Sequence, residues 1–417
     1  MDAIPLSPED RAILELESDT VAGHTCKVVV LGEGAPGLDA LRAQIADRLG
    51  LTPALRRRLG GGAREPAWVP AEGFEIGDHV VAGNRGVALD RGELPAQVAG
   101  LFAQRLPRDR PLWRIDVLPL NGGGAALVWR IHHAVADGTT TMRYARLLLW
   151  GDPAASSAEA APAPASHAAD DARRRGHLAA FVRREFARSR SGSPFDGRIG
   201  TRREIGFATA PLAALHDASK ALADATLNDA VLAVLAGALR RWLESEHGSL
   251  AEVRAKVPVS LHHEGDDAGN RDSFFTLPLP LNQPDPVARL RAVRAATATR
   301  KGEHDAQEID TLHRELAHVS PRLEAFCERI ERSPRRFALN VSNVPGPRVP
   351  VAVLGAPVAE LHSIAEIGQR HALRVAVVSC AGTLGFGFCA DPGIVAGLES
   401  LVSGTAAEAA ALVGARS

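Results

Sequence analysis

A low-complexity stretch near the middle of the chain constrains the fold more than any other feature. Residues 151–172 read GDPAASSAEAAPAPASHAADDA, which is rich in Ala, Pro and Ser and has no hydrophobic periodicity. Such composition is typical of a flexible crossover. Because 417 residues exceed what one ordinary core accommodates, we expect an N-terminal half over residues 1–150, a linker over 151–175 and a C-terminal half over 176–417.

Strand-like and helix-like runs alternate on both sides of this crossover, which predicts an α/β protein. In the N-terminal half we expect strands at 26–31, 112–118 and 126–131 and helices at 38–49 and 94–106. In the C-terminal half we expect a nearly all-apolar helix at 226–243, strands at 253–261, 274–281 and 337–342, helices at 286–301 and 306–331, and a hairpin that turns at Ala381–Gly382–Thr383.

Composition and charge argue against several classes of protein. The formal net charge is −1, from 48 basic and 49 acidic residues, so no global field attracts nucleic acid. The N-terminal sequence lacks a basic region followed by an apolar one, and the longest apolar run, Ala230–Leu239, is far shorter than the roughly 20 residues of a membrane span. We expect a cytoplasmic protein with no transmembrane segment and no nucleic-acid partner, while peripheral contact with lipid stays open.

The four cysteines give no metal or disulfide pattern. Cys26, Cys327, Cys380 and Cys389 form no CxxC pair and lie in apolar sequence. Small buried side chains are the interpretation that fits best. Cys380 and Cys389 are expected to face each other across the C-terminal hairpin, in the reduced state.

The segment Trp129–Trp150 carries the chemistry-bearing pattern. An apolar strand runs into His132 and His133, and Asp137 and Gly138 follow before a helix begins. A histidine at a strand end is fixed in place, and its imidazole can take a proton from a hydroxyl, amine or thiol and later return it. Asp137 is expected to orient the turn, and Gly138 to permit a backbone angle that a side chain would forbid.

Two other interpretations of this turn exist. A structural histidine pair is the usual explanation of an HH dipeptide, but the full HHxxxDG string between a strand and a helix favours chemistry. A metal site with His132, His133 and Asp137 as ligands is less favourable, because adjacent residues of a strand point to opposite faces.

HHAVADG matches the HHxxxDG motif of the CoA-dependent acyltransferase superfamily, which includes chloramphenicol acetyltransferase and the condensation domains of peptide synthetases. Within it, the chain resembles the bacterial wax ester synthase/diacylglycerol acyltransferase family. Matching segments occur in order along the chain, at Pro5–Asp19, Pro111–Trp113, Leu227–Leu243, Ala268–Leu281, Asn340–Val351 and Gly382–Asp391.

This resemblance implies two half-domains, each a mixed sheet flanked by helices, with a tunnel at their interface. It implies that His133 is the general base, that His132 and Asp137 support the loop, and that acyl-CoA is a co-substrate with no bound cofactor. The acyl group, expected to be long, would go to a hydroxyl acceptor such as a fatty alcohol or diacylglycerol. Substrate-binding candidates from matched segments are Asn270, Ser342, Asn343 and Ser379, each of which could instead form a turn.

The sequence departs from the family in ways that bear on the acceptor. The chain is somewhat short, and residues 21–26 read VAGHTC where a Met-His pair is expected. The loop His262–Gly269 is unusually acidic and rich in histidine. An alternative substrate is therefore a polyketide or peptide metabolite, acylated from CoA or a carrier protein. An alternative of another class is a non-catalytic homologue that binds lipid or CoA.

Two further motifs are weaker. Gly32–Gly37 reads GEGAPG and fits a dinucleotide-binding loop, but no second strand ending in an acid follows, and Pro36 would crowd the turn. His262, His263 and Glu264 could bind a metal, although a solvated loop explains them better. No GxSxG motif of a serine hydrolase is present.

Overall fold

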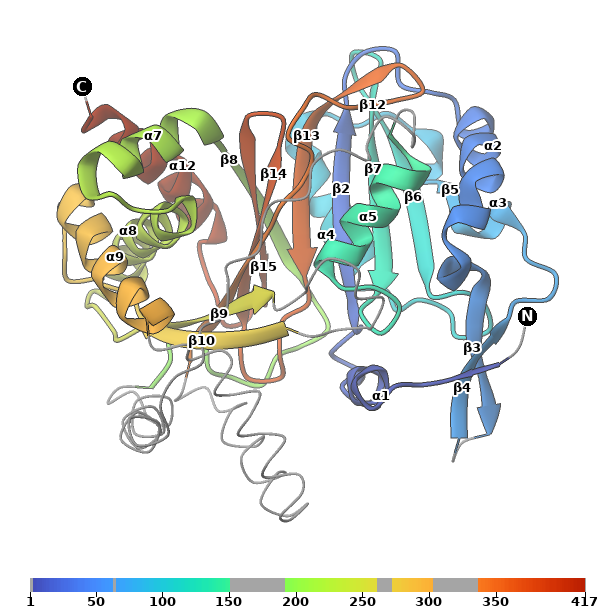
Figure 1. Ribbon diagram of the computed structural model, residues 1–417, viewed down its shortest axis with the longest axis horizontal. Coiled ribbons are helices and arrows are strands. Elements are labelled where there is room, and N and C mark those ends of the chain that lie inside the picture. The colour runs from blue at the N-terminus through green and yellow to red at the C-terminus, as the bar shows by residue number, and fades with distance from the viewer. Residues whose placement is uncertain (1–2, 63–64, 151–191, 261–271, 303–336, 417) are drawn as a thin grey trace.

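The computed structural model describes residues 3–62, 65–150, 192–260, 272–302 and 337–416. Two six-stranded sheets lie side by side in these residues, and helices cover their outer faces (Figure 1). This arrangement confirms the predicted α/β fold with two sheet-containing halves. The expected linker over 151–175, the expected helix at 306–331 and Cys327 lie outside the described residues.

The sheet of the N-terminal half has strand order β12-β13-β2-β7-β6-β5. Helices α2 and α5 pack on one face and α4 on the other, because the strands are apolar on both faces. The bounds are β2 His24–Leu31, β5 Val80–Ala82, β6 Trp113–Leu120, β7 Gly124–His132, β12 Ala352–Val353, β13 Ala356–Ala365, α2 Leu38–Arg48, α4 Leu94–Phe102 and α5 Gly138–Leu148.

The sheet of the C-terminal half has strand order β10-β9-β11-β14-β15-β8, with helices on its outer face (Figure 1). The bounds are β8 Glu204–Pro211, β9 Arg254–Ser260, β10 Asp272–Pro278, β11 Leu339–Val344, β14 Leu373–Cys380, β15 Thr383–Ala390, α7 Leu212–Ala223, α8 Leu227–His247, α9 Pro286–Gly302 and α12 Leu398–Gly414. Helix α8 begins with a capping box between Thr226 and Asp229 and is buried along most of its length. The predicted apolar helix is therefore confirmed.

Shorter elements complete the N-terminal half. A small sheet of order β1-β4-β3 lies beside α1 at the edge of the molecule (Figure 1). The bounds are β1 Ile4–Pro5, α1 Pro8–Glu15, β3 Arg57–Gly62, β4 Glu65–Pro70, α3 Ile76–His79, and the 3-10 turns Leu49–Leu51, Pro53–Arg56, Asn84–Gly86 and Arg91–Glu93.

Strand β13 joins the two halves. It follows β11 in the chain, yet it pairs antiparallel with β2 in the sheet of the N-terminal half. Residues 352–365, which follow the expected boundary at 176 in the chain, therefore belong to the first sheet. Gly385 and Gly387 of β15 let the backbone of β13 approach closely, since a Cβ at either position would overlap a β13 carbonyl. The described residues form two buried hydrophobic clusters, of which one runs through both halves and the other lies mainly in the N-terminal half.

The C-terminal hairpin turns at Ala381 and Gly382, both with positive φ, as a two-residue connection requires. Cys380 lies opposite Thr383, whereas Cys389 lies opposite Arg374. The expectation that the two cysteines face each other is therefore wrong, because the tight turn fixes a register that separates them.

The strand before GEGAPG does not belong to a dinucleotide-binding fold. Strand β2 is antiparallel to both of its neighbours, β7 and β13, whereas that fold places the loop after a strand of a parallel sheet. Among the described residues, no single helix has the length and apolarity to cross a membrane. Helices α7 and α8 meet that test only as a pair bent by 93°.

Candidate active site

The histidine turn lies where β7 leaves the sheet. His132 is the last residue of β7, and the backbone N–H of His133 donates to the carbonyl of Gly23, at 3.0 Å. Asp137 is the N-cap of α5, and its Oδ1 accepts from the backbone N–H of Thr140 at 2.6 Å. The turn is thus held at one end by the segment before β2 and at the other end by its own helix cap.

His132 is buried and turned toward the N-terminal segment. Its Nδ1 accepts from the backbone N–H of Ala134 at 3.2 Å, and its Nε2 lies 3.5 Å from Glu17 Oε1. Glu17 also binds Arg108. Burial alone would raise the pKa of Glu17, but hydrogen bonds and charges from His132 and Arg108 lower it overall. The carboxylate therefore stays ionised beside the His132 ring.

Gly23 is the close neighbour of this ring. Its φ is +70°, and a Cβ added to it would lie 2.6 Å from His132 Nε2. Only glycine adopts this conformation without strain while leaving room for the imidazole. The family departure VAGHTC therefore supplies a glycine that the histidine turn requires.

His133 is half-buried, and its pKa is shifted by its surroundings. Burial and the positive charge of Arg374 lower its pKa to about 4, against a smaller opposing effect of Asp137. The imidazole is therefore neutral near pH 7 and can accept a proton. Among the described residues, no group of three or more His, Cys, Asp or Glu side chains is arranged to hold a metal ion.

The C-terminal half contacts this turn through β11. A Cβ on Gly138 would lie 2.9 Å from Val344 Cγ2, at the end of that strand. Gly138 is not in the positive-φ region, so the predicted need for a special backbone angle is wrong. A glycine is needed here because the other half packs against it.

Strand register places the remaining candidates. Ser342 lies two residues before Val344, and Arg374 lies beside Asn340 on the neighbouring strand, so these side chains share the face toward the histidine turn. Asn343 alternates to the other face and is exposed. The structure therefore brings Ser342 toward the turn and does not bring Asn343.

Ser379 has a local partner, because its hydroxyl accepts from the backbone N–H of Gly346 at 3.0 Å. It holds the segment that follows β11. Asn270 and the loop His262–Gly269 lie outside the described residues.

A buried lysine lies behind the motif. Lys27 on β2 donates to Ser363 Oγ on β13 at 2.7 Å, and its Nζ lies 4.0 Å from the Cβ position of Gly138. Burial lowers its pKa to about 8, and the charge of Asp137 acts in the opposite direction. At neutral pH its ammonium therefore partly offsets the buried carboxylate that caps α5.

A pocket of about 390 Å³ opens between α1 and β3. Apolar side chains of Leu6, Leu14 and Leu59 line it together with Arg11 and Arg108. Arg108 also binds Glu17, whose Oε1 lies 3.5 Å from His132 Nε2.

Sequence reasoning missed Glu17, Gly23, Lys27 and Arg374. Glu17 lies within a matched segment, and Arg374 and Lys27 are single charges inside apolar strands. A lone charge in an otherwise buried strand is the signal that would have found the latter two, since an unpartnered buried charge is costly.

Comparison with known proteins places the chain in a family. Residues 6–187 match the model of the wax ester synthase/diacylglycerol acyltransferase catalytic domain, and residues 268–412 match the WS/DGAT C-terminal domain. A protein of Mycobacterium tuberculosis named as a probable diacylglycerol O-acyltransferase is 28% identical over 440 residues, which cover 95% of this chain and 94% of that protein. Another of the same species is 28% identical over 444 residues, covering 97% and 94%.

Solved structures agree in fold. The wax ester synthase/diacylglycerol acyltransferase of Marinobacter aquaeolei VT8 superimposes with a TM-score of 0.72 at 21% identity, covering 99% of both chains. The starter condensation domain of rhizomide synthetase in complex with C8-CoA gives a TM-score of 0.59 at 14% identity, covering 98% and 95%. Together with the two family matches, these findings show that the chain belongs to the wax ester synthase/diacylglycerol acyltransferase family.

Proposed function

We propose that this protein is an O-acyltransferase that moves an acyl group from acyl-CoA to a hydroxyl acceptor such as a fatty alcohol or diacylglycerol, with His133 as the general base. The observation that carries the proposal is the environment of His133. The imidazole follows directly after the buried strand β7 and feels the charge of Arg374 from the C-terminal half, and burial and Arg374 together keep it neutral. A neutral imidazole on a fixed backbone is what deprotonation of an alcohol requires.

The proposed reaction is direct transfer. His133 takes the proton of the acceptor hydroxyl, and the oxygen attacks the thioester carbonyl to form a tetrahedral oxyanion. This intermediate expels the CoA thiolate, which takes the proton back from the imidazolium. A thiolate is a good leaving group near neutral pH, so one base and correct positioning carry most of the work.

Other residues would serve this chemistry without bonding to the acyl group. The Arg374 guanidinium, which acts on His133 electrostatically, would favour negative charge developing on the thioester oxygen or on sulfur. Ser342 lies on the same face of its sheet and stays the better substrate-binding candidate of β11. A long acyl chain would be held by burial of its methylenes, each contributing about 0.8 kcal/mol.

The proposal also covers the cellular compartment and the acyl donor. Cys26, Cys380 and Cys389 are free and buried, which fits the reducing cytoplasm. CoA is the proposed donor, and a carrier protein is the alternative that the condensation-domain fold leaves open. We propose no bound cofactor.

The test offers purified protein a panel of acyl-CoA thioesters together with fatty alcohol, diacylglycerol or a cell extract, and identifies products by mass spectrometry. We expect an ester of the alcohol or of diacylglycerol. Products formed only from the extract would favour a metabolite acceptor, and no turnover with any pair would favour a non-catalytic binding protein.

A second measurement tests direct transfer. Incubation with acyl-CoA alone should leave the protein mass unchanged and release no stoichiometric burst of CoA, because His133 acts only as a base. The Cys26 thiol gives a built-in check, since burial raises its pKa to about 12 and so suppresses its nucleophilic thiolate. A stable gain of one acyl group, lost on replacing a single cysteine or serine, would contradict direct transfer.

A further inference from the structure

A buried ion pair lies at the junction of the two halves and has no role in the proposed reaction. Arg203 precedes β8 and Glu366 follows β13, and Arg203 Nε lies 2.8 Å from Glu366 Oε1. Their side chains are only 2% and 8% exposed. Such a pair gains little net stability, because desolvation of both charges offsets their attraction. Its importance therefore depends on what it holds in place.

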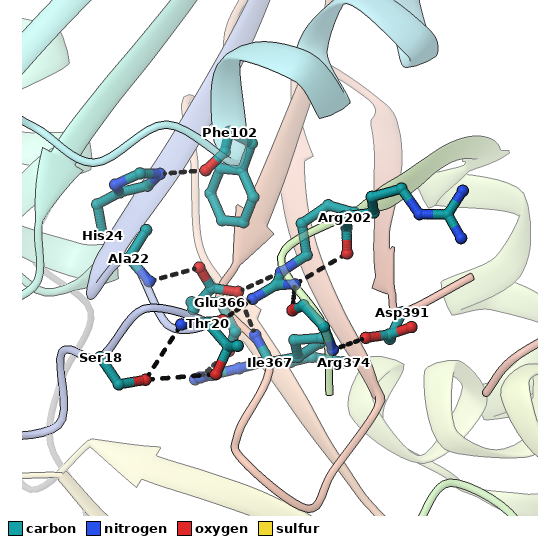
Figure 2. Close-up of polar contacts among 12 residues, drawn as sticks. Ser18, Thr20, Ala22, His24, Phe102, Arg202, Glu366, Ile367, Arg374 and Asp391 are labelled. Carbon is teal, nitrogen blue, oxygen red and sulfur yellow. Dashed lines mark hydrogen bonds and ion pairs between the residues drawn. The ribbon is translucent and has the colours of Figure 1, made fainter. Parts of the chain in front are cut away.

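Glu366 binds three other groups in addition to Arg203. Its Oε2 accepts from the backbone N–H of Ala22 at 3.1 Å, and its Oε1 accepts from the N–H of Ile367 at 3.0 Å. Its backbone carbonyl accepts from Arg374 Nη1 at 2.9 Å. Figure 2 shows Glu366 at the centre of these contacts. One residue thus connects the segment before β2 with the arginine beside His133.

Arg203 completes the connection with backbone carbonyls. Its Nη1 donates to the carbonyls of Gly200 and Arg202 at 2.8 and 2.9 Å, and its Nη2 donates to the carbonyl of Thr20. A guanidinium can make these bonds together because its five donors lie in one fixed plane. The pair therefore ties residues 20–22, 200–203 and 366–374 into one unit.

Two of these segments act on His133. The chain runs from Thr20 and Ala22 to Gly23, whose carbonyl accepts from the backbone N–H of His133 at 3.0 Å. Arg374 supplies the positive charge that acts on the His133 ring. The ion pair thus contacts the segment that hydrogen-bonds to the backbone of His133. It also contacts Arg374, whose charge acts on the His133 ring.

We propose that Arg203 and Glu366 are positioning residues for acyl transfer, which hold the Gly23 carbonyl and the Arg374 guanidinium in fixed relation to His133. This inference rests on the proposed function of His133. Arg203 and Glu366 do not touch substrate in this proposal, and they act through Gly23 and Arg374. Loss of the ion pair should loosen both, so that the base loses its alignment and part of its electrostatic environment.

The decisive experiment uses the full-length Glu366→Gln variant and follows the titration of the His133 ring by NMR of histidine-labelled protein. The His133→Ala variant identifies the signal. Asp137 and His132 also act on this ring, and the substitution leaves both in place. We expect the pKa of His133 to rise toward 6.5, because Arg374 is no longer held beside it. We also expect kcat to fall at least tenfold while KM changes less than threefold.

The exposed ion pair of Asp196 with Arg370 provides the matched control. Arg370 lies on the same connection between β13 and β14, and its two bonds to Asp196 are 2.8 and 2.9 Å long. The Asp196→Asn variant should leave both the titration of His133 and kcat unchanged. If Glu366→Gln does not fold, Arg203→Lys takes its place, since lysine keeps the charge but cannot make the several bonds of arginine.

The Arg374→Gln variant tests whether Glu366 acts on His133 through Arg374. If Glu366 acts on the His133 titration through Arg374, the double variant should show the same pKa as Arg374→Gln alone. The NMR titration requires no turnover, so it tests the positioning even if no acyl acceptor is accepted. A folded Glu366→Gln or Arg203→Lys variant with the wild-type titration of His133 would overturn the inference.

Discussion

Two buried arginine–glutamate pairs hold different parts of this molecule. Arg203 and Glu366 lie where the two sheets meet, and Arg289 and Glu408 lie among the helices that cover the outer face of the C-terminal sheet. Arg289 Nε also donates to the carbonyl of Ala233 on α8, at 3.0 Å. The second pair therefore ties α9 and α12 to the apolar helix α8, in the same way that the first ties three segments of the junction.

The two ion pairs differ in the residues that surround them. Around Arg289 and Glu408 the neighbours are helix backbones and Gly237, where a Cβ would lie 2.5 Å from Arg289 Nη2. Around Arg203 and Glu366 the neighbours lead to Gly23 and the histidine turn. The same ionic chemistry is thus expected to determine stability in the helical layer and reactivity at the junction.

The largest effect should come from breaking the helical pair. Glu408→Gln leaves the buried Arg289 charge without its carboxylate, which typically destabilises a protein by about 3–5 kcal/mol. We expect a loss of this size in the free energy of unfolding, measured by urea denaturation, with the His133 titration unchanged in the folded protein. A shift of that titration would show that the helical layer and the junction are coupled.

Replacing His133, the proposed base, should lower the reaction rate with little effect on stability. We expect His133→Ala to lower kcat by a factor of 10² or more, or about 2.7 kcal/mol in the barrier. Its free energy of unfolding should stay close to that of the wild type, because the half-buried ring lies in the turn after β7 and belongs to neither hydrophobic cluster. Wild-type turnover in the purified variant would remove His133 from the mechanism.

The histidine turn and its surrounding elements were predictable because local sequence encodes them. An apolar run ending in His132 specifies a strand end, and Asp137 before three threonines specifies a helix cap. Strand β13 was not predictable, because its partner β2 lies more than 300 residues earlier in the chain and no local pattern specifies that pairing. The sequence around Glu366 is that of an ordinary surface acid, so its burial against Arg203 could not be predicted either.

Asp137 is expected to affect both stability and reactivity, because it caps α5 and belongs to the histidine turn. Asp137→Ala should cost about 1 kcal/mol of stability from the lost cap, and it leaves the buried Lys27 ammonium without its nearby counter-charge. We therefore expect a lower free energy of unfolding together with reduced kcat. Asp196→Asn is the control for removal of an exposed carboxylate. A variant that unfolds like the wild type would contradict the structural role of Asp137.

The smallest effect concerns acid pH, where the junction should make the enzyme unusually tolerant. An imidazole with an ordinary pKa of 6.5 would lose about tenfold in its neutral form by pH 5.5. Because burial and Arg374 lower the pKa of His133 to about 4, we expect kcat/KM to change less than about twofold between pH 7.5 and 5.5. The rate should then fall as the pH approaches 4, when the base becomes protonated. A midpoint near 6.5 would contradict the assigned environment.

This measurement needs a stability control, since two other buried histidines lower the stability of the fold at acid pH. Burial lowers the pKa of His24 to about 3 and that of His371 to about 4. Both folded-state values lie below the 6.5 of an unfolded chain, so the unfolded state binds more protons and stability falls as the pH drops below 6.5. Circular dichroism at each pH must therefore show folded protein. A rate loss that follows unfolding, and not protonation of His133, should shift to lower pH in the His371→Gln variant, which removes one of these groups.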